Sequence, residues 1–226
     1  MKSFLKVISL IIAMSLILCG CDNEVVNPEE NISETESNKI IDNIETSEVG
    51  FFNGEYNDKN IVLKVNNNNN KPVYLNYSFE VFDNKKNKLF NKEVIVRVGA
   101  KDSAYVIGIQ DLEEPSFDSY SYKISLLNES LDDYESIKKT IKADYNDNGK
   151  IIKLTFNNTG YRSTTVYGVL LFYKSKKLVA VKEVTAYNLK PHNVEEIKVD
   201  YPIKKANQKI SFDKIEFVVN EVSTEL

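Results

Sequence analysis

Few residues of this chain are of the types that carry catalysis or bind metals. Its 226 residues include one histidine, His192, two cysteines, Cys19 and Cys21, and no tryptophan. One imidazole excludes a two-histidine metal site, and a Ser-His-Asp triad would have to use His192 as its base. Because His192 follows Lys-Pro and precedes Asn, a setting typical of a solvated turn, we expect no catalytic residue, no cofactor and no enzyme activity.

One acidic segment matches the first half of a calcium-binding loop. Residues 144–149 read Asp-Tyr-Asn-Asp-Asn-Gly, which makes Asp144, Asn146 and Asn148 candidate calcium ligands. The twelfth position of such a loop, where a bidentate glutamate should stand, is Thr155. Asn, Asp and Gly are also the residues that a tight hairpin turn needs. We therefore favour a hairpin turn and keep a calcium site as the alternative.

Two pairs of adjacent acids, Glu113-Glu114 and Asp132-Asp133, are the remaining catalytic candidates. A glycosidase needs two carboxylates about 5–10 Å apart across a cleft. Adjacent acids in loops are more often solvated surface. A hydrolase would need a cleft at the junction between domains, and it is the third of the functions that we consider.

Tyrosines are numerous in this chain and could bind a protein or a sugar. All thirteen follow residue 50, and most fall in segments that we expect to be strands, where packing in a core is the default. Tyr161, in the loop from Asn157 to Arg162, is the candidate for an exposed binding residue. The lack of tryptophan weakens the carbohydrate interpretation.

The first residues of the chain have the pattern of an export signal. Lys2 and Lys6 precede an apolar run from Val7 to Leu18, which has the length of a signal-peptide core and is short for a membrane span. Residues 18–21, Leu-Cys-Gly-Cys, resemble the lipobox of bacterial lipoproteins. The resemblance implies removal of residues 1–20 and a diacylglycerol on Cys21. We expect a lipid-anchored protein on the extracytoplasmic face of the cell membrane, with an uncleaved transmembrane anchor as the alternative.

Residues 21–49 are predicted to be a disordered tether. From Asp22 to Val49 there are nine acids, the single base Lys39 and no aromatic residue. Such a segment buries too little apolar surface to offset its ordering entropy. As a flexible coil it would span about 30 Å, which would lift the body clear of the headgroups. A short helical turn at the isoleucines 40, 41 and 44 is the alternative.

The charge of the body excludes one class of partner. The chain carries −4 overall, of which the leader contributes +2 and the tether −8, so residues 50–226 carry +2. A body this close to neutral has no strong basic field, and we expect no nucleic-acid partner.

The body consists of two copies of one pattern. Residues 63–67, Leu-Lys-Val-Asn-Asn, match 154–158, Leu-Thr-Phe-Asn-Asn, and three further short matches follow the same order at offsets of 89–91. The last of them pairs Lys123–Leu126 with Lys214–Phe217. These matches predict two domains, 50–134 and 135–226.

Alternating apolar residues predict strands throughout both copies. In Val73–Val81 every second residue is apolar, which is typical of a half-buried strand, whereas Val166–Tyr173 is apolar on both faces. We infer that the second strand is central or that something covers its other face. The remaining predicted strands are 61–66, 89–98, 104–109, 120–127, 151–156, 178–187, 194–201 and 210–219, and the polar segment 129–140 is a short helix or an extended connector.

Many strands in units of under 100 residues predict an all-β fold of two tandem immunoglobulin-like β-sandwiches. Residues 79–83, Phe-Glu-Val-Phe-Asp, resemble the stretch that names the FxLYD domains of Gram-positive surface proteins, and an Asn-rich turn, 66–70, precedes them as in that family. In the second copy, 170–174 has lost both Phe and Asp, and Leu189-Lys190-Pro191 resembles the family's Leu-x-Pro turn. The resemblance implies a cell-surface sandwich without known chemistry.

These observations predict a non-catalytic role. We expect a binding or spacer module at the cell surface that engages a protein partner. A module that binds cell-wall polysaccharide is the second hypothesis.

Overall fold

The computed structural model describes residues 34–55, 59–110, 117–128, 131–204 and 208–224. Within these ranges the chain forms twelve strands and two helices, α2 and α3. Residues 32–226 make up one compact unit. The leader and Cys21 lie outside the described residues, so the predictions made for them remain predictions.

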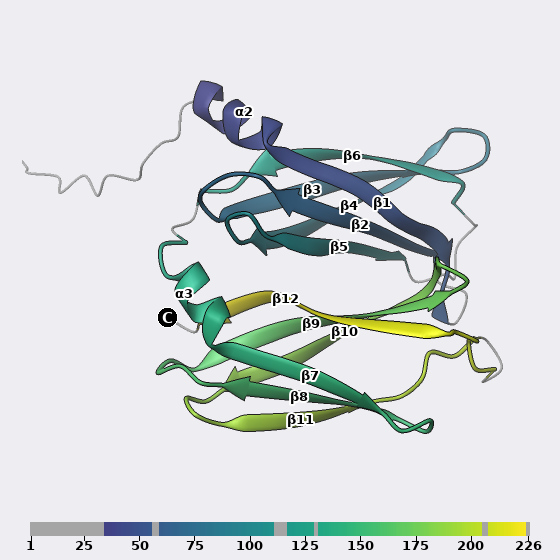
Figure 1. Cartoon of the computed structure of the whole chain (residues 1–226). Coiled ribbons are helices and arrows are strands. Elements are labelled where there is room, and N and C mark those ends of the chain that lie inside the picture. Colours follow the sequence, from purple (N-terminus) through teal and green to yellow (C-terminus); the bar gives the residue numbers. More distant parts are fainter. Residues whose placement is uncertain (1–33, 56–58, 111–116, 129–130, 205–207, 225–226) are drawn as a thin grey trace, which may run out of the picture. The chain divides into compact units, whose positions relative to one another are not determined.

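The first repeat is a sandwich of two three-stranded antiparallel sheets, with strand orders β1-β2-β5 and β4-β3-β6. A helix precedes its six strands (Figure 1). The elements are α2 (Glu34–Asp42), β1 (Ile44–Asn53), β2 (Lys59–Asn67), β3 (Val73–Phe82), β4 (Lys88–Val98), β5 (Ser103–Gln110) and β6 (Ser119–Leu126).

The second repeat has the same order of elements and the same topology. Its sheets run β7-β8-β11 and β10-β9-β12, so each strand has a counterpart six strands earlier. The elements are α3 (Tyr134–Thr140), β7 (Ile141–Asp147), β8 (Ile152–Asn158), β9 (Thr164–Lys174), β10 (Lys177–Leu189), β11 (Val194–Val199) and β12 (Lys214–Thr224). The predicted all-β fold of two sandwiches is confirmed.

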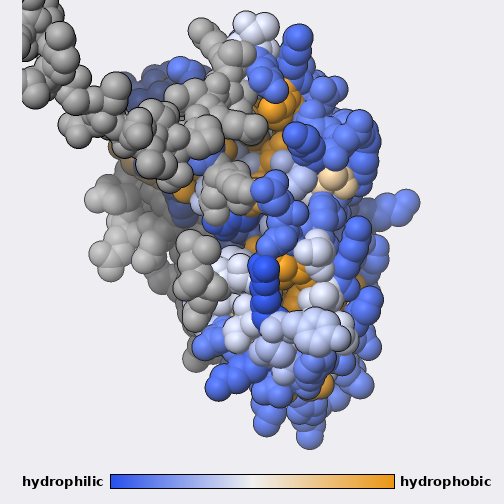
Figure 2. Space-filling view, turned by 90° about the vertical axis from the view of Figure 1, so that its left-hand side faces the viewer, coloured by the Kyte–Doolittle hydropathy of each residue, from blue (hydrophilic) through white to orange (hydrophobic). Residues whose placement is uncertain are grey.

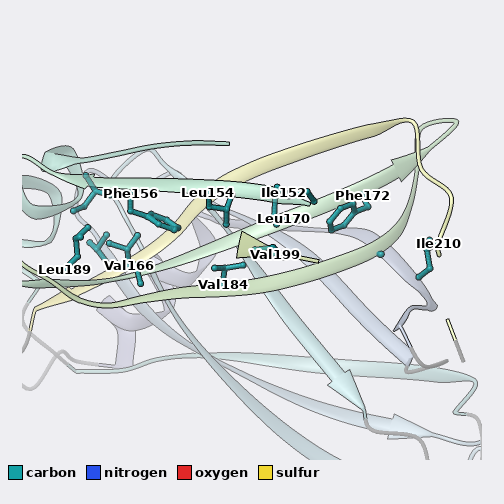
Figure 3. Packing of buried hydrophobic residues seen from close by; sticks show 14 of the residues in the cluster. Ile152, Leu154, Phe156, Val166, Leu170, Phe172, Val184, Leu189, Val199 and Ile210 are labelled. Atoms are coloured by element: carbon teal, nitrogen blue, oxygen red, sulfur yellow. The ribbon is translucent and has the colours of Figure 1, made fainter. Parts of the chain in front are cut away.

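Each sandwich has its own apolar core between its two sheets, as the alternation predicts. In the first, the inward side chains of β3 from Val73 to Val81 are all buried and face those of β2 and β5. In the second, residues of β8 such as Leu154 and Phe156 meet Leu170 and Phe172 of β9 (Figure 3).

A third apolar core joins the two sandwiches. Val62 and Ile107, on the outer face of the β1-β2-β5 sheet, contact the outer face of the β10-β9-β12 sheet. The buried residues on that second face are Val169, Leu171, Leu178 and Val181. This core explains why Val166–Tyr173 is apolar on both faces, and the expectation that something covers its second face is confirmed.

The predicted disorder of residues 21–49 is wrong for its C-terminal half. Helix α2 begins at Glu34 and β1 begins at Ile44, and residues 22–33 lie outside the described part. Order is possible here because Ile40 and Ile44 pack against the core of the first sandwich. The segment 129–140 contains a helix, α3, as one of its two interpretations proposed.

Two further sequence predictions need correction. Strands β1 and β7 were not predicted. The offset of 91 also fails at the last strand, since Phe79 pairs with Tyr122 while its counterpart Leu170 pairs with Phe217. Tyr122 is therefore equivalent to Phe217, four residues beyond the position that the sequence match gave.

Candidate functional site

In each sandwich one buried asparagine fixes the loops at the end where the helix lies. Asn158, at the end of β8, donates from Nδ2 to the carbonyls of Arg162 (2.8 Å) and Leu189 (2.9 Å). Its Oδ1 accepts the N–H of Gly160 (2.9 Å). One side chain thus holds the β8–β9 loop against the end of β10.

Asn67 does the same in the first repeat. It donates to the carbonyls of Lys71 (2.9 Å) and Gly99 (2.8 Å), and its Oδ1 accepts the N–H of Asn69 (2.9 Å). Both asparagines are almost fully buried, at 1% and 0% exposure. The Asn-Asn pairs that reveal the repeat in the sequence therefore have a structural role, which is to order two loops.

Tyr161 lies at the tip of the loop that Asn158 orders. Its side chain is 89% exposed, and its ring meets the ring of His192 edge to face at 5.2 Å between centroids. His192 comes from the neighbouring β10–β11 loop. We call this pair the aromatic tip. Both of its residues were considered as candidates from the sequence, and in the described part of the structure their rings are in contact.

The backbone under His192 is held in a sharp turn. His192 has φ of +57°, and its counterpart Lys101 has φ of +54°. The N–H of Asn193 donates to the carbonyl of Lys190 (3.1 Å), which closes the turn that begins with Leu189-Lys190-Pro191. A left-handed residue at this position projects its side chain from the loop in both repeats.

The calcium candidates form a strand and a hairpin. Asp144 and Asn146 lie in β7, and Asn148 lies in the turn to β8, where Gly149 has φ of +80°. Oδ1 of Asn148 accepts the N–H groups of Lys150 and Ile151, each at 3.0 Å. These bonds match the hairpin interpretation. Among the described residues no three His, Cys, Asp or Glu side chains gather as metal ligands.

The acid pairs lie in different surroundings. Asp133 precedes α3 and pairs with Arg162 of the β8–β9 loop at 2.6 Å, with both side chains well exposed. Glu113 and Glu114 lie outside the described residues. Asp133 is paired with Arg162, while His192 contacts Tyr161.

Side chains from both repeats fill the described part of the junction between them. Nη1 of Arg97 lies 2.5 Å from Oε1 of Glu221, and the two side chains are 20% and 11% exposed. The guanidinium also stacks over the ring of Tyr74 at 4.2 Å. Tyr134 of α3 donates its hydroxyl to the carbonyl of Arg97 (3.1 Å).

Further polar contacts extend this junction. Asn220 binds the backbone of Tyr105 in both directions, at 2.5 and 2.9 Å, and Lys182 pairs with Glu55 at 3.1 Å. Burial, and then the nearby charge of Glu221, raise the pKa of the Tyr134 hydroxyl well above its ordinary value. The junction is therefore a set of paired groups beside an apolar core.

A shallow polar depression lies beside the β9–β10 turn. Its lining residues are Tyr173, Ser175, Lys176, Asp213, Lys214 and Glu216. Most of its polar groups bind one another, since Asp213 accepts the N–H of Ser175 (2.8 Å) and Lys214 pairs with Glu216. It does not contain any of the residues predicted as functional.

The FxLYD-like stretch ends β3 and forms its turn. Oδ1 of Asp83 accepts the N–H groups of Lys85 and Asn87, each at 2.8 Å. Hydrogen bonds from Asn87 lower the pKa of Asp83. The Phe and Val positions of the stretch, Phe79 and Val81, are buried in the first core. In this chain the motif has a structural role.

Comparisons with known proteins leave the family open. No family model matches the chain, and no curated protein does. The solved structures with some similarity include red sea bream transglutaminase, with 8% identity and a TM-score of 0.26, which covers 70% of this chain. The chain spans 27% of that transglutaminase.

A second solved structure is the YadV chaperone, with 12% identity and a TM-score of 0.21 over 81% of this chain and 100% of the chaperone. Neither similarity is close enough to carry an argument. None of the described helices is long and apolar enough to cross a membrane.

Sequence reasoning missed the polar contacts of the junction. Arg97 and Glu221 are far apart in the chain, and each stands in an ordinary strand pattern. Only one signal pointed to the junction, namely the second apolar face of β9.

Proposed function

We propose that this chain is a membrane-anchored, extracytoplasmic lipoprotein that acts as a non-catalytic binding module for a protein partner. The anchor rests on the Leu-Cys-Gly-Cys sequence that ends at Cys21. The FxLYD-like stretch agrees with a place on the cell surface. Two acyl chains on Cys21 would give stable attachment, whereas one chain is marginal.

The aromatic tip carries the binding part of the proposal. The side chain of Tyr161 is 89% exposed, so it contributes little to the packing of the fold. It contacts His192, and buried Asn158 holds the loops that carry both residues. Tyrosine offers a large contact surface at low cost in side-chain entropy, and a rigid loop lowers the entropy lost on binding. A protein surface is a suitable partner for such a tip.

The binding proposal is tested by crosslinking from the tip. A photo-crosslinking amino acid at position 161 should trap a specific protein on intact cells, which mass spectrometry would identify. Tyr187, which is 74% exposed on β10, provides the matched control position. Equal yields of the same partners from positions 161 and 187, or none from 161, would overturn a protein-binding tip.

Binding to cell-wall polysaccharide is the alternative, since an exposed aromatic face also stacks on sugar rings. Purified wall should be incubated with the wild type, with Tyr161→Ala and with Tyr187→Ala. Saturable binding that only Tyr161→Ala abolishes would favour the polysaccharide. Absence of wall binding, together with a crosslinked protein, would favour the protein partner.

The anchor is tested independently by mass spectrometry of the membrane fraction. The mature N-terminus should be Cys21 with attached acyl chains, and Cys21→Ser should carry no acyl mass. An unmodified Met1 on a soluble species would refute the anchor and would leave the binding test unaffected.

A further inference from the structure

The two repeats pack through faces that are not equivalent. The first repeat contributes its β1-β2-β5 sheet, whose counterpart in the second repeat is β7-β8-β11. The second contributes its β10-β9-β12 sheet, whose counterpart in the first is β4-β3-β6. A contact of this kind is head-to-tail, and it does not close on itself as a two-fold contact does.

One copy of each face therefore remains free. The outer β8 face of the second repeat corresponds to the face that the first repeat uses, and the outer β3 face corresponds to the face that the second uses. If the free faces had the chemistry of the used ones, copies of this chain would stack end to end.

Strand pairing shows which residues correspond. Val62 pairs with Ile107 in the first repeat, and Lys153 pairs with Lys198 at the same place in the second. All six buried residues of the third core have polar counterparts. The pairs are Val62 and Lys153, Ile107 and Lys198, Val169 and Ser78, Leu171 and Glu80, Leu178 and Lys88, and Val181 and Asn91.

Charged pairs stand on the free faces where the used faces have apolar contacts. Glu80 and Lys88 pair at 2.7 Å at the positions of Leu171 and Leu178. Lys153 and Glu196 pair at 2.6 Å on the other free face. Because these groups are hydrated, covering them with a second copy would cost desolvation energy without an apolar gain.

We propose that the outer faces of the two sheets of a repeat are complementary docking surfaces. The chain uses one pair of these faces between its own repeats, and polar side chains on the other pair prevent a second copy from docking. The chain is thus a capped module of two repeats. Terminal repeats of stacked repeat proteins keep a polar outer face for the same reason.

Two variants of residues 32–226, each with apolar side chains in place of the polar ones on one free face, test this proposal. The first, Lys153→Val with Lys198→Ile, places the side chains of Val62 and Ile107 on the free β8 face. The second, Ser78→Val with Glu80→Leu and Lys88→Leu, places those of Val169, Leu171 and Leu178 on the free β3 face. Sedimentation equilibrium measures the mass of each variant alone and of their equimolar mixture, and circular dichroism checks that each is folded.

The mixture should form a one-to-one complex with twice the mass of either variant, while each variant alone stays a monomer. Controls with Lys153→Arg and Lys198→Arg, which keep the charge, should not associate with the second variant. A mixture that remains monomeric would show that these side chains do not close the faces. Equal self-association of either variant alone would show nonspecific association through the new apolar side chains, and would also overturn the proposal.

Discussion

At the scale of single residues, the buried asparagines fix the conformation of the loops, including the one that carries the exposed Tyr161. Asn158 satisfies two carbonyls and one N–H of the β8–β9 and β10–β11 region. These backbone groups would otherwise be buried without partners, which costs about 1–3 kcal/mol each. The position of Tyr161 therefore depends on a residue that never touches a ligand.

Replacing that asparagine should weaken the fold and loosen the tip. Asn158→Ala should lower the free energy of unfolding by about 2–3 kcal/mol, as measured by urea denaturation. Asn157→Ala, one residue earlier on the outer side of β8, is the control and should change it by less than about 0.5 kcal/mol. Equal effects of the two substitutions would argue against the loop-ordering role of Asn158.

The pKa of Tyr77 gives a prediction for alkaline pH. Burial of its hydroxyl, which bonds Thr46 at 2.8 Å, raises its pKa from 10.0 to about 12. The folded state therefore favours the protonated form, so this contribution to stability is complete below about pH 10 and is lost as the pH rises toward 12.

Tyr77→Phe separates this effect from that of other tyrosines. The variant should be about 1 kcal/mol less stable at pH 7, because the bond to Thr46 is lost. Above pH 10 its stability should fall less steeply than that of the wild type in urea titrations. Parallel curves for the two proteins would show that Tyr77 does not titrate with unfolding.

At the scale of elements, the same strand position is apolar in one repeat and basic in the other. Val62→Lys would put an ammonium group into the third core, and should destabilise the protein by about 3 kcal/mol or more. Lys153→Val, the reverse change at the equivalent position, should alter stability by less than about 1 kcal/mol. Thermal unfolding of both variants tests this contrast, and similar losses would refute the assignment of the used and free faces.

Ten of the twelve described strands could be predicted from alternation, and the two that could not share a physical reason. Each lies in a stretch whose polar residues favour another interpretation: β1 begins inside the acidic segment that reads as a tether. β7 alternates Ile141, Ala143 and Tyr145 with polar residues, but it runs into Asn146-Asp147-Asn148-Gly149, which reads first as a turn.

The third core was predictable only in part. The apolar outer face of β9 signals a cover, but the cover itself comes from Val62 and Ile107, which pair across β2 and β5. Their apolarity reads equally well as an ordinary strand interior. The candidate site shows the same division, since the sequence indicates an exposed loop at Tyr161 but not its contact with His192, which topology alone brings close.

At the scale of the whole molecule, the ion pair of Arg97 and Glu221 joins strands 124 positions apart. Arg97→Met should destabilise the protein by about 3 kcal/mol, because it leaves a largely buried carboxylate without its guanidinium. Arg97→Met combined with Glu221→Gln should cost less than Arg97→Met alone. Denaturant titrations of the single and double variants give the coupling energy, and strictly additive losses would contradict the pairing.

The start of the fold at α2 limits how far the body can lie from the proposed anchor. Helix α2 lies at the same end of the molecule as α3 (Figure 1), and α3 ends at Thr140, whose carbonyl accepts the N–H of Thr159 in the loop that carries Tyr161 (2.9 Å). The part of this end that Figure 2 shows in colour is mainly hydrophilic, with a few hydrophobic residues between the polar ones.

Twelve residues lie between Cys21 and Glu34, so the two ends of this segment can be at most about 45 Å apart when it is fully extended. Glu34, the first described residue, begins α2, which lies at the same end of the body as the aromatic tip. If Cys21 is acylated as proposed, a protein that binds Tyr161 would occupy the end of the body at which the chain from the lipid enters the fold.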